Sequence, residues 1–276
     1  MPSAPLPDRA ILTVTGEDAG HFLQNLITAD LDMLGEGEAR PAALLTPQGK
    51  ILFDFLVSRI EGGFRLDVAG VARADLLKRL TLYKLRSKVA LAPGEEAVGV
   101  SWEEAGEDGL VDRRFTQGNV RRHYGEPLAG DAQDFHALRI AAGIMEAEAD
   151  FPASDVFPHD VLLDQNDGVS FRKGCYVGQE VVSRMQHRGT ARRRVMVLRA
   201  ESHITPGANV EVGGRTVGTV LAAAGTVAAA LVRIDKVAGA LRAGEELVVD
   251  GVPAQAEIPE WAGYALPEEA PAGDAS

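Results

Sequence analysis

The pattern of apolar residues changes near residue 190, and this change limits the folds that the chain can adopt. From Arg192 onward, short β-like runs are separated by turns at Pro206-Gly207, Gly213-Gly214, Gly225, Gly239 and Gly244. Short strands with regular glycine turns are typical of a small closed barrel or a sandwich. Residues 190–264 are therefore predicted to form an all-β domain, a small β-barrel.

Residues 1–189 combine helical and strand-like spacing. Apolar periodicity predicts helices in the segment that follows the capping signal Thr15-Gly-Glu-Asp18, over 73–84, over 131–142, and between Gly178 and Gly189. Two strand-like runs, 41–46 and 51–58, flank Pro47-Gln48-Gly49 and predict a hairpin, and shorter runs predict strands over 64–68, 89–92 and 97–102.

The predicted fold class is therefore α+β, with antiparallel sheets and helices in one region or two subdomains over 1–189, followed by the small barrel. The tail, residues 265–276, is rich in Pro, Glu, Ala and Gly, and we expect it to be disordered.

Length and cysteine content set the broad class of the protein. The 276 residues suffice for one large or two moderate domains. The longest apolar runs, such as 227–232, are far too short to cross a bilayer, and residues 1–9 lack a secretory pattern. A single cysteine excludes an internal disulfide framework. We therefore expect a cytoplasmic protein with no membrane partner.

The net charge of −12 argues against bulk nucleic-acid binding. The charge is uneven, because residues 166–200 hold eight Lys or Arg and two acids, a local charge of +6 that leaves −18 for the remainder. An acidic protein with one basic island suits a small anion better than a polyanion. A solvated basic face is the alternative, and an RNA-associated factor that uses this island is a further one.

The only cysteine of the chain lies within this basic segment. Arg172 and Lys173 precede Cys175, and a predicted helix follows it. The two cations and the start of the helix all favour the thiolate, which is the reactive form of the thiol. A thiolate can attack an electrophile, ligate iron or exchange with a disulfide. One thiolate cannot hold a 4Fe–4S cluster, which takes about four sulfur ligands. The alternative is a buried, inert cysteine. The histidines are scattered, so no metal site is predicted.

Residues 173–180 read Lys-Gly-Cys-Tyr-Val-Gly-Gln-Glu, and this octapeptide resembles the signature of the YgfZ-type folate-binding proteins. These proteins are relatives of the glycine-cleavage T-protein (aminomethyltransferase) and include a mitochondrial iron–sulfur assembly factor. The segments 15–24 and 82–89 also resemble the first helix and the middle segment of the family. The resemblance covers roughly residues 10–260.

The resemblance implies a T-protein-like folate-binding region followed by a small C-terminal β-barrel. It implies tetrahydrofolate, or a one-carbon-substituted or polyglutamylated form, as the ligand, and iron–sulfur client or assembly proteins as partners. The implied role is support of 4Fe–4S proteins, including radical-type tRNA-modifying enzymes, with Cys175 as the reactive thiol. Whether the chain is an enzyme stays open, and a folate-dependent one-carbon transferase that uses Asp54 is the alternative.

Asp54 is the second candidate catalytic residue. It shares an apolar face of the predicted strand 51–58 with two leucines, where a carboxylate must find hydrogen bonds or have its pKa raised. Residues 49–54 resemble a T-protein segment that ends in two acids, one of them catalytic, and Phe53 takes the first of these positions. A carboxylate suits one-carbon chemistry because it can move a proton or stabilise an iminium-like carbon. A hydrogen-bonded strand-edge aspartate is the alternative.

The resemblance also assigns cofactor-binding residues. Asp160 falls where the T-protein carries a glutamate that reads the pterin, and a carboxylate can accept two hydrogen bonds from an aminopyrimidinone edge. A loop or helix-cap aspartate is the alternative there. The remaining predicted contacts are Lys173, Gly174, Tyr176, Gly178, Gln179, Glu180 and Arg184.

The chemistry of these residues gives a physical reason for each predicted contact. The two glycines are expected to supply a positive φ or a close ligand approach. Glu180 and Arg184 are four apart and can pair on one helix face. Tyr176 can stack on an aromatic ligand, or it is a core aromatic.

Overall fold

The computed structural model describes residues 2–103, 106, 108–116 and 119–268. It divides into two compact units, the first comprising 1–135, 146–158 and 163–184, and the second 136–145, 159–162 and 185–276. The predicted domain boundary near residue 190 stays a prediction. Most of the predicted disordered tail, residues 269–276, lies outside the described residues.

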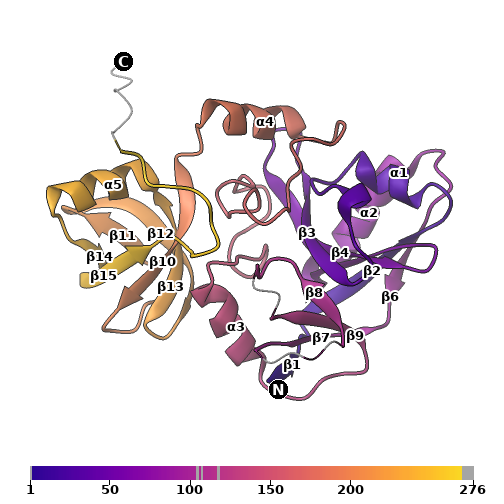
Figure 1. Cartoon of the computed structure of the whole chain (residues 1–276), viewed down its shortest axis with the longest axis horizontal. Helices are drawn as coiled ribbons and strands as arrows, with labels where there is room; N and C mark the ends of the chain where they lie inside the picture. Colours follow the sequence, from indigo (N-terminus) through magenta and orange to yellow (C-terminus); the bar gives the residue numbers. More distant parts are fainter. Residues whose placement is uncertain (1, 104–105, 107, 117–118, 269–276) are drawn as a thin grey trace. The chain divides into compact units, whose positions relative to one another are not determined.

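Among the described residues of the first unit, nine strands form one sheet in the order β1-β7-β9-β8-β3-β4-β5-β2-β6 (Figure 1). The strands are β1 (Ser3–Pro5), β2 (Arg9–Thr15), β3 (Glu38–Leu45), β4 (Ile51–Ile60), β5 (Gly63–Ala69), β6 (Ala90–Gly94), β7 (Ala97–Ser101), β8 (Leu110–Asp112) and β9 (Arg121–Gly125). The predicted β3–β4 hairpin is confirmed, with Ala42 opposite Phe55. The predicted strands β5, β6 and β7 are confirmed too, whereas β1, β2, β8 and β9 had not been predicted.

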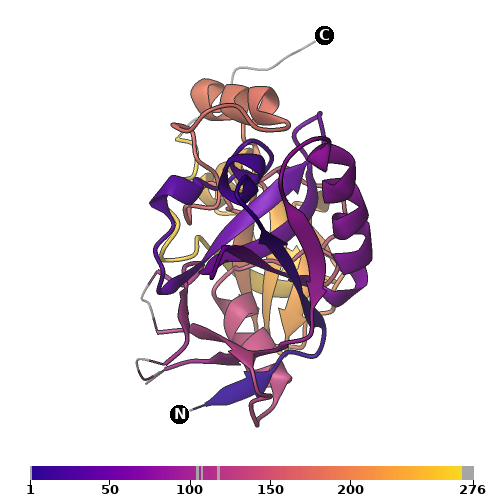
Figure 2. The same ribbon diagram turned by 90° about the vertical axis from the view of Figure 1, so that its right-hand side faces the viewer.

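Helices α1 (Ala19–Gln24) and α2 (Arg73–Lys84) pack on one face of the β4-β5-β2 part of this sheet (Figures 1 and 2). Leu76 and Leu80 of α2 are fully buried there, because they recur on one side of the helix. Side chains alternate along a strand, so Phe53 and Phe55 of β4 face this core and Asp54 faces the opposite side of the sheet.

The remaining predicted helices are also present. They are α3 (Ala132–Ala141) and α4 (Gln179–Arg188), and the described residues outside the barrel also form two short 3-10 turns, η1 (Leu31–Met33) and η2 (Gly70–Ala72). One detail of the prediction was wrong. The Asp18 carboxylate does not cap α1 but accepts a hydrogen bond from the backbone N–H of Lys88 at 2.7 Å.

In the second unit, six strands over residues 193–257 close into a barrel in the order β10-β13-β12-β11-β14-β15. They are β10 (Arg193–Ala200), β11 (Asn209–Val212), β12 (Arg215–Ala224), β13 (Val227–Arg233), β14 (Leu247–Val249) and β15 (Val252–Glu257). Alternate residues such as Met196, Leu198 and Val210 fill its interior. The predicted small C-terminal barrel is confirmed.

The prediction that this region is all β was wrong in one place. Helix α5 (Ile234–Ala243) lies between β13 and β14 and packs against the barrel core through Ile234, Val237 and Ala240 (Figure 1). Gly239, which had been assigned to a turn, lies inside this helix, whereas Gly244 ends it in the left-handed conformation with φ of 69°. No helix of the described residues is long and apolar enough to span a membrane.

Candidate functional site

The sheet face opposite α1 and α2 carries a cluster of buried charged side chains. Arg9 of β2 donates from Nε to Oδ1 of Asp67 on β5 at 2.7 Å, and its Nη1 lies 3.8 Å from Oε2 of Glu146. The hydroxyl of Tyr124 on β9 donates to the other Asp67 oxygen at 3.2 Å. The side chains of Arg9, Asp67 and Glu146 are at least 97% buried, so each buried charge has to be compensated by an opposite charge.

Two further arginines extend this cluster. Arg114 donates from Nη2 to Asp112 at 2.8 Å and from Nη1 to Glu146 at 2.5 Å. Arg122 is fully buried, donates from Nε to Asp112 at 3.1 Å, and lies 3.5 Å from Glu146. Glu146 therefore lies among three arginines and is the common partner of the cluster.

Asp54 lies beside this cluster. Its Oδ2 accepts a hydrogen bond from the backbone N–H of Ala147 at 3.2 Å, while its Oδ1 is buried and accepts none from the described residues. Burial raises the pKa of Asp54 to about 6, Arg9 opposes this rise and Glu146 adds to it. The carboxyl group can therefore gain or lose a proton near neutral pH, and one of its oxygens has no partner in the part of the chain that the structure describes. This combination suits a general acid or base or a ligand-binding carboxyl.

Cys175 lies in the first unit on the segment that leads to α4, and its side chain is exposed. The alternative of a buried cysteine is therefore wrong, and the reactivity of the thiol stays a prediction. The helix begins at Gln179, four residues after Cys175. Asp54 makes no hydrogen bond or ion pair with residues 172–180 in the described part of the chain.

Lys173 anchors this segment. Its Nζ donates to the backbone carbonyls of Ile27 at 2.9 Å and Ala29 at 2.7 Å, and lies 5.4 Å from the centre of the Tyr176 ring. Burial lowers the pKa of Lys173 to about 8. The ammonium group thus holds the Cys175 segment against the loop that follows α1.

The two glycines of the motif differ. Gly178 has φ of 79°, and a Cβ atom there would lie 2.5 Å from the carbonyl oxygen of Thr46, so only glycine fits. Gly174 has no positive φ, and a Cβ atom there would meet nothing within 4 Å. Of the two expected reasons for glycine, the positive φ is confirmed at Gly178, whereas it does not apply at Gly174, where a close ligand approach stays a prediction.

Tyr176 is 6% exposed, and its hydroxyl is buried without a hydrogen-bond partner among the described residues. Burial raises the pKa of Tyr176 to about 12. On α4, Glu180 and Arg184 pair at 2.6 Å as predicted, but both side chains are largely exposed. Gln179 is half-buried, and its N–H donates to the carbonyl of Tyr176 at 3.3 Å.

Asp160 belongs to the second unit. It is 2% exposed, and its Oδ2 accepts from Nη2 of Arg193 at 2.6 Å. Its backbone carbonyl accepts from the N–H of Val195 at 2.9 Å. An aminopyrimidinone ligand at Asp160 would have to share this carboxylate with Arg193.

Four residues of the cluster were not predicted from the sequence: Arg9, Arg114, Arg122 and Glu146. Glu146 is a single charge between Met145 and Ala147, whereas Arg9, Arg114 and Arg122 each follow another charged residue. Among these four residues, only the isolated Glu146 carried a signal of a buried ion pair. The partners lie far apart in the sequence, so spacing alone could not pair them.

Comparisons with known proteins agree with this architecture. A family profile described as CAF17, C-terminal beta-barrel domain, matches residues 192–264, which contain all six barrel strands. The human protein named iron-sulfur cluster assembly factor IBA57, mitochondrial, is 32% identical over 301 residues, which cover 93% of this chain and 84% of the human protein. The tRNA-modifying protein YgfZ of Cronobacter sakazakii is 30% identical over 261 residues, 79% of each chain.

The chain belongs to the IBA57/YgfZ family. The resemblance to YgfZ-type proteins that the 173–180 motif predicted is therefore confirmed. The fold of this IBA57/YgfZ family member is similar to that of the glycine cleavage system aminomethyltransferase T from Bartonella henselae, with a TM-score of 0.74 over 94% of this chain and 86% of that one. At 16% identity this likeness shows the fold alone, and it confirms the predicted T-protein-like architecture.

Proposed function

We propose that this chain is a tetrahydrofolate-binding accessory factor for the maturation or repair of iron–sulfur (4Fe–4S) proteins, with Cys175 as its reactive thiol. The IBA57 relatives are named iron–sulfur cluster assembly factors, which supports the general role. The observation that carries the thiol assignment is the exposed Cys175 on a segment fixed by Lys173 and Gly178. A thiol that serves a partner protein has to be both accessible and held in place.

An iron–sulfur cluster would be cargo shared with another molecule. No group of three or more His, Cys, Asp or Glu side chains in the described residues could hold a metal ion. Because a 4Fe–4S cluster takes about four ligands, Cys175 would supply one ligand and a second chain or a small thiol such as glutathione the others. The partners are therefore iron–sulfur client or assembly proteins.

Two buried polar atoms of the first unit fit a polar ligand such as a folate. Asp54 Oδ1 and the Tyr176 hydroxyl lack partners among the described residues, and buried polar atoms are seldom left unpaired. Asp54 would hold or move a proton at a ligand nitrogen. Tetrahydrofolate, or a one-carbon-substituted or polyglutamylated form, would supply the one-carbon carrier when bound. The other proposed contacts are Asp160, Lys173, Gly174, Gly178, Gln179, Glu180 and Arg184.

A second candidate function is a folate-dependent one-carbon transferase that uses Asp54. It is favoured by the raised pKa of Asp54, about 6, which suits proton transfer near neutral pH.

A third candidate follows from the name of the relative, tRNA-modifying protein YgfZ. The net charge of −12 disfavours direct contact with RNA. We infer that any link to tRNA modification runs through iron–sulfur enzymes. We also propose a cytoplasmic location, because a chain with a single cysteine has no internal disulfide framework.

The first two candidates share the premise that the protein binds folate. Calorimetric titration of the purified protein with tetrahydrofolate tests this premise. Absence of saturable binding overturns both. In cells that lack the factor, Cys175→Ala should fail to restore 4Fe–4S enzyme activity, while Lys78→Ala, at an exposed position of α2 outside the proposed site, should restore it. Full rescue by Cys175→Ala removes the thiol from the proposal. Loss of one-carbon transfer in Asp54→Asn with normal rescue separates the transferase from the maturation role.

A further inference from the structure

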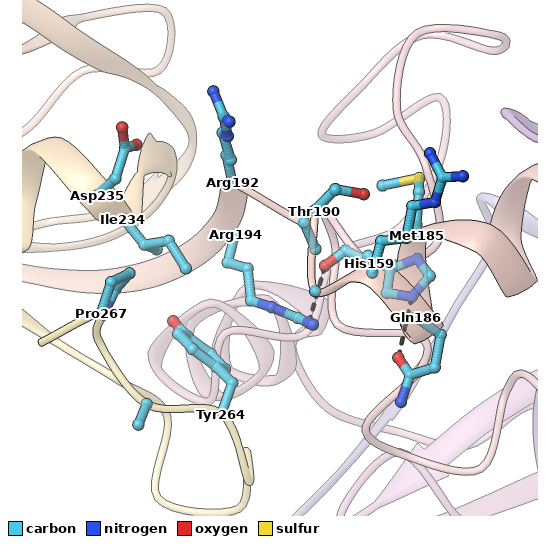
Figure 3. A pocket seen from close by; sticks show the side chains of 14 residues that line it. His159, Met185, Gln186, Thr190, Arg192, Arg194, Ile234, Asp235, Tyr264 and Pro267 are labelled. Atoms are coloured by element: carbon cyan, nitrogen blue, oxygen red, sulfur yellow. Dashed lines mark hydrogen bonds between the residues drawn. The ribbon is translucent and has the colours of Figure 1, made fainter. Parts of the chain in front are cut away.

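The second unit contains a cavity of about 450 Å³ that the proposed function does not use. Its walls come from the end of α4 and the residues after it, from the start of β10, from the first turn of α5, and from residues 264–267 (Figure 3). Three arginines line it, Arg188, Arg192 and Arg194. This volume admits a small metabolite or the end of a larger ligand.

The charge of the cavity wall is strongly positive. Asp235 is the acid among the lining residues, and both of its oxygens are taken by Arg233, at 2.9 and 2.7 Å. Arg188 and Arg192 are exposed, and neither side chain makes a hydrogen bond or ion pair with the described residues. Two guanidinium groups at the wall are therefore available to an anion.

Arg194 supplies a third cation in a fixed position. It is 7% exposed, and its Nη1 donates to the carbonyl of His159 at 3.1 Å. Figure 3 shows its guanidinium group between His159 and the ring of Tyr264, whose centre is 5.0 Å away. The Tyr264 hydroxyl is itself held by the carbonyl of Val195 at 2.9 Å. Such a stacked guanidinium is ordered before any ligand arrives.

The start of α5 adds to the positive charge of the cavity wall. Ile234 and Asp235, the first two residues of the helix, line the cavity, so the partial positive charge of the helix N-terminus lies at its wall. Thr190 and Gln186 add neutral hydrogen-bonding groups. The wall thus combines cations of fixed and of adjustable position with neutral polar groups.

We propose that this cavity is a binding site for a small oxyanion, either a phosphate-bearing ligand or one with several carboxylates. Guanidinium groups bind both kinds of oxyanion in a bidentate way. Arg194 provides the ordered contact, and Arg188 and Arg192 close on the ligand from the rim. None of these residues serves the proposed function, so failure of this proposal leaves that function untouched.

Calorimetric titration of the full chain with pyrophosphate and with citrate, at constant ionic strength, tests the site. We expect saturable binding that weakens about tenfold or more in the double variant Arg188→Gln/Arg192→Gln. Both arginines are exposed, so this variant should fold. Arg215→Gln, an exposed arginine on β12 of the same barrel, is the matched control and should bind like the wild type.

The comparison of the two probes assigns the ligand class. Tighter binding of pyrophosphate points to a phosphate-bearing ligand, and tighter binding of citrate to a polycarboxylate. Absence of saturable binding for both probes overturns the proposal. Equal weakening in Arg215→Gln and in the double variant also overturns it, because it indicates general screening of a basic surface.

Discussion

The Cα atom of Gly49 lies 3.1 Å from the place that a Cβ atom would take on Gly178. The turn between β3 and β4 and the start of α4 therefore touch through their backbones. The same turn leads into β4, which carries Asp54, and the same helix follows the segment that carries Cys175. This contact fixes two segments that are 129 positions apart in the sequence, and it explains the glycine at each position.

Gly178→Ala should destabilise the protein by about 2–4 kcal/mol, because alanine has to adopt a positive φ and its Cβ meets the carbonyl of Thr46. Gly174→Ala is the matched control in the same motif. It should change the free energy of unfolding by less than about 0.5 kcal/mol, since its site is open. Urea denaturation of both variants measures this. Equal effects of the two substitutions contradict the close approach.

Asp54 should make the protein less stable as the pH rises. Its pKa is about 6 in the folded protein and near 3.8 in the unfolded chain, so the folded state holds the proton more tightly. Stability is therefore lost as the pH rises from about 4 to about 6, by about 3 kcal/mol at most. Asp54→Asn should remove this slope and be at least as stable as the wild type at pH 7. Urea denaturation across this range tests it, and parallel pH profiles of the two proteins contradict it.

Local patterns predicted much of this fold. The β3–β4 hairpin, α2 and α4 follow from spacing within a few residues, and the 173–180 motif identified the family. Strand β9 was missed because its sequence, Arg121-Arg-His-Tyr-Gly125, gives no apolar signal. Arg122 of this strand is buried only because Asp112 and Asp67 compensate its charge from other strands. Helix α5 was missed because Gly239 suggested a turn, although Ile234, Val237 and Leu241 keep helical spacing.

Some residues of the candidate site could be predicted from local sequence patterns, and others could not. Cys175 and Asp54 could be identified from their own neighbourhoods in the sequence. The charges that surround Asp54 could not, because Arg9 and Glu146 are separated by 137 positions and meet only when the sheet forms. Long-range pairing of buried ions depends on strand register, which spacing along the chain does not encode.

Removal of the common carboxylate of the cluster should be costly. Glu146→Gln leaves Arg9, Arg114 and Arg122 with less compensating charge in a buried environment, and we expect a loss of about 3–5 kcal/mol. Glu180→Gln breaks an exposed Glu–Arg pair and should cost under about 0.5 kcal/mol. Thermal unfolding of the two variants compares them. Similar melting temperatures contradict the role assigned to the cluster.

Lys173→Met should loosen the segment that carries Cys175. The substitution removes the donor to the carbonyls of Ile27 and Ala29, so the backbone amides of residues 170–178 should exchange with deuterium faster. Arg172→Met is the matched control, because it removes a neighbouring cation whose side chain is exposed. Unchanged exchange in Lys173→Met, or an equal increase in both variants, contradicts the anchoring role.

Tyr176→Phe should separate ligand binding from stability. The Tyr176 hydroxyl is buried without a partner in the described part of the chain, so its removal should leave the free energy of unfolding unchanged or raise it by about 1 kcal/mol. The same variant should bind tetrahydrofolate several-fold more weakly, because a buried hydroxyl kept without a protein partner is available to a ligand. Tyr124→Phe is the control: its hydroxyl donates to Asp67 at 3.2 Å, and its loss should cost about 1 kcal/mol without affecting the ligand. Equal destabilisation by both substitutions means that the Tyr176 hydroxyl has a partner within the folded protein, such as a buried water, and removes it from the proposed folate site.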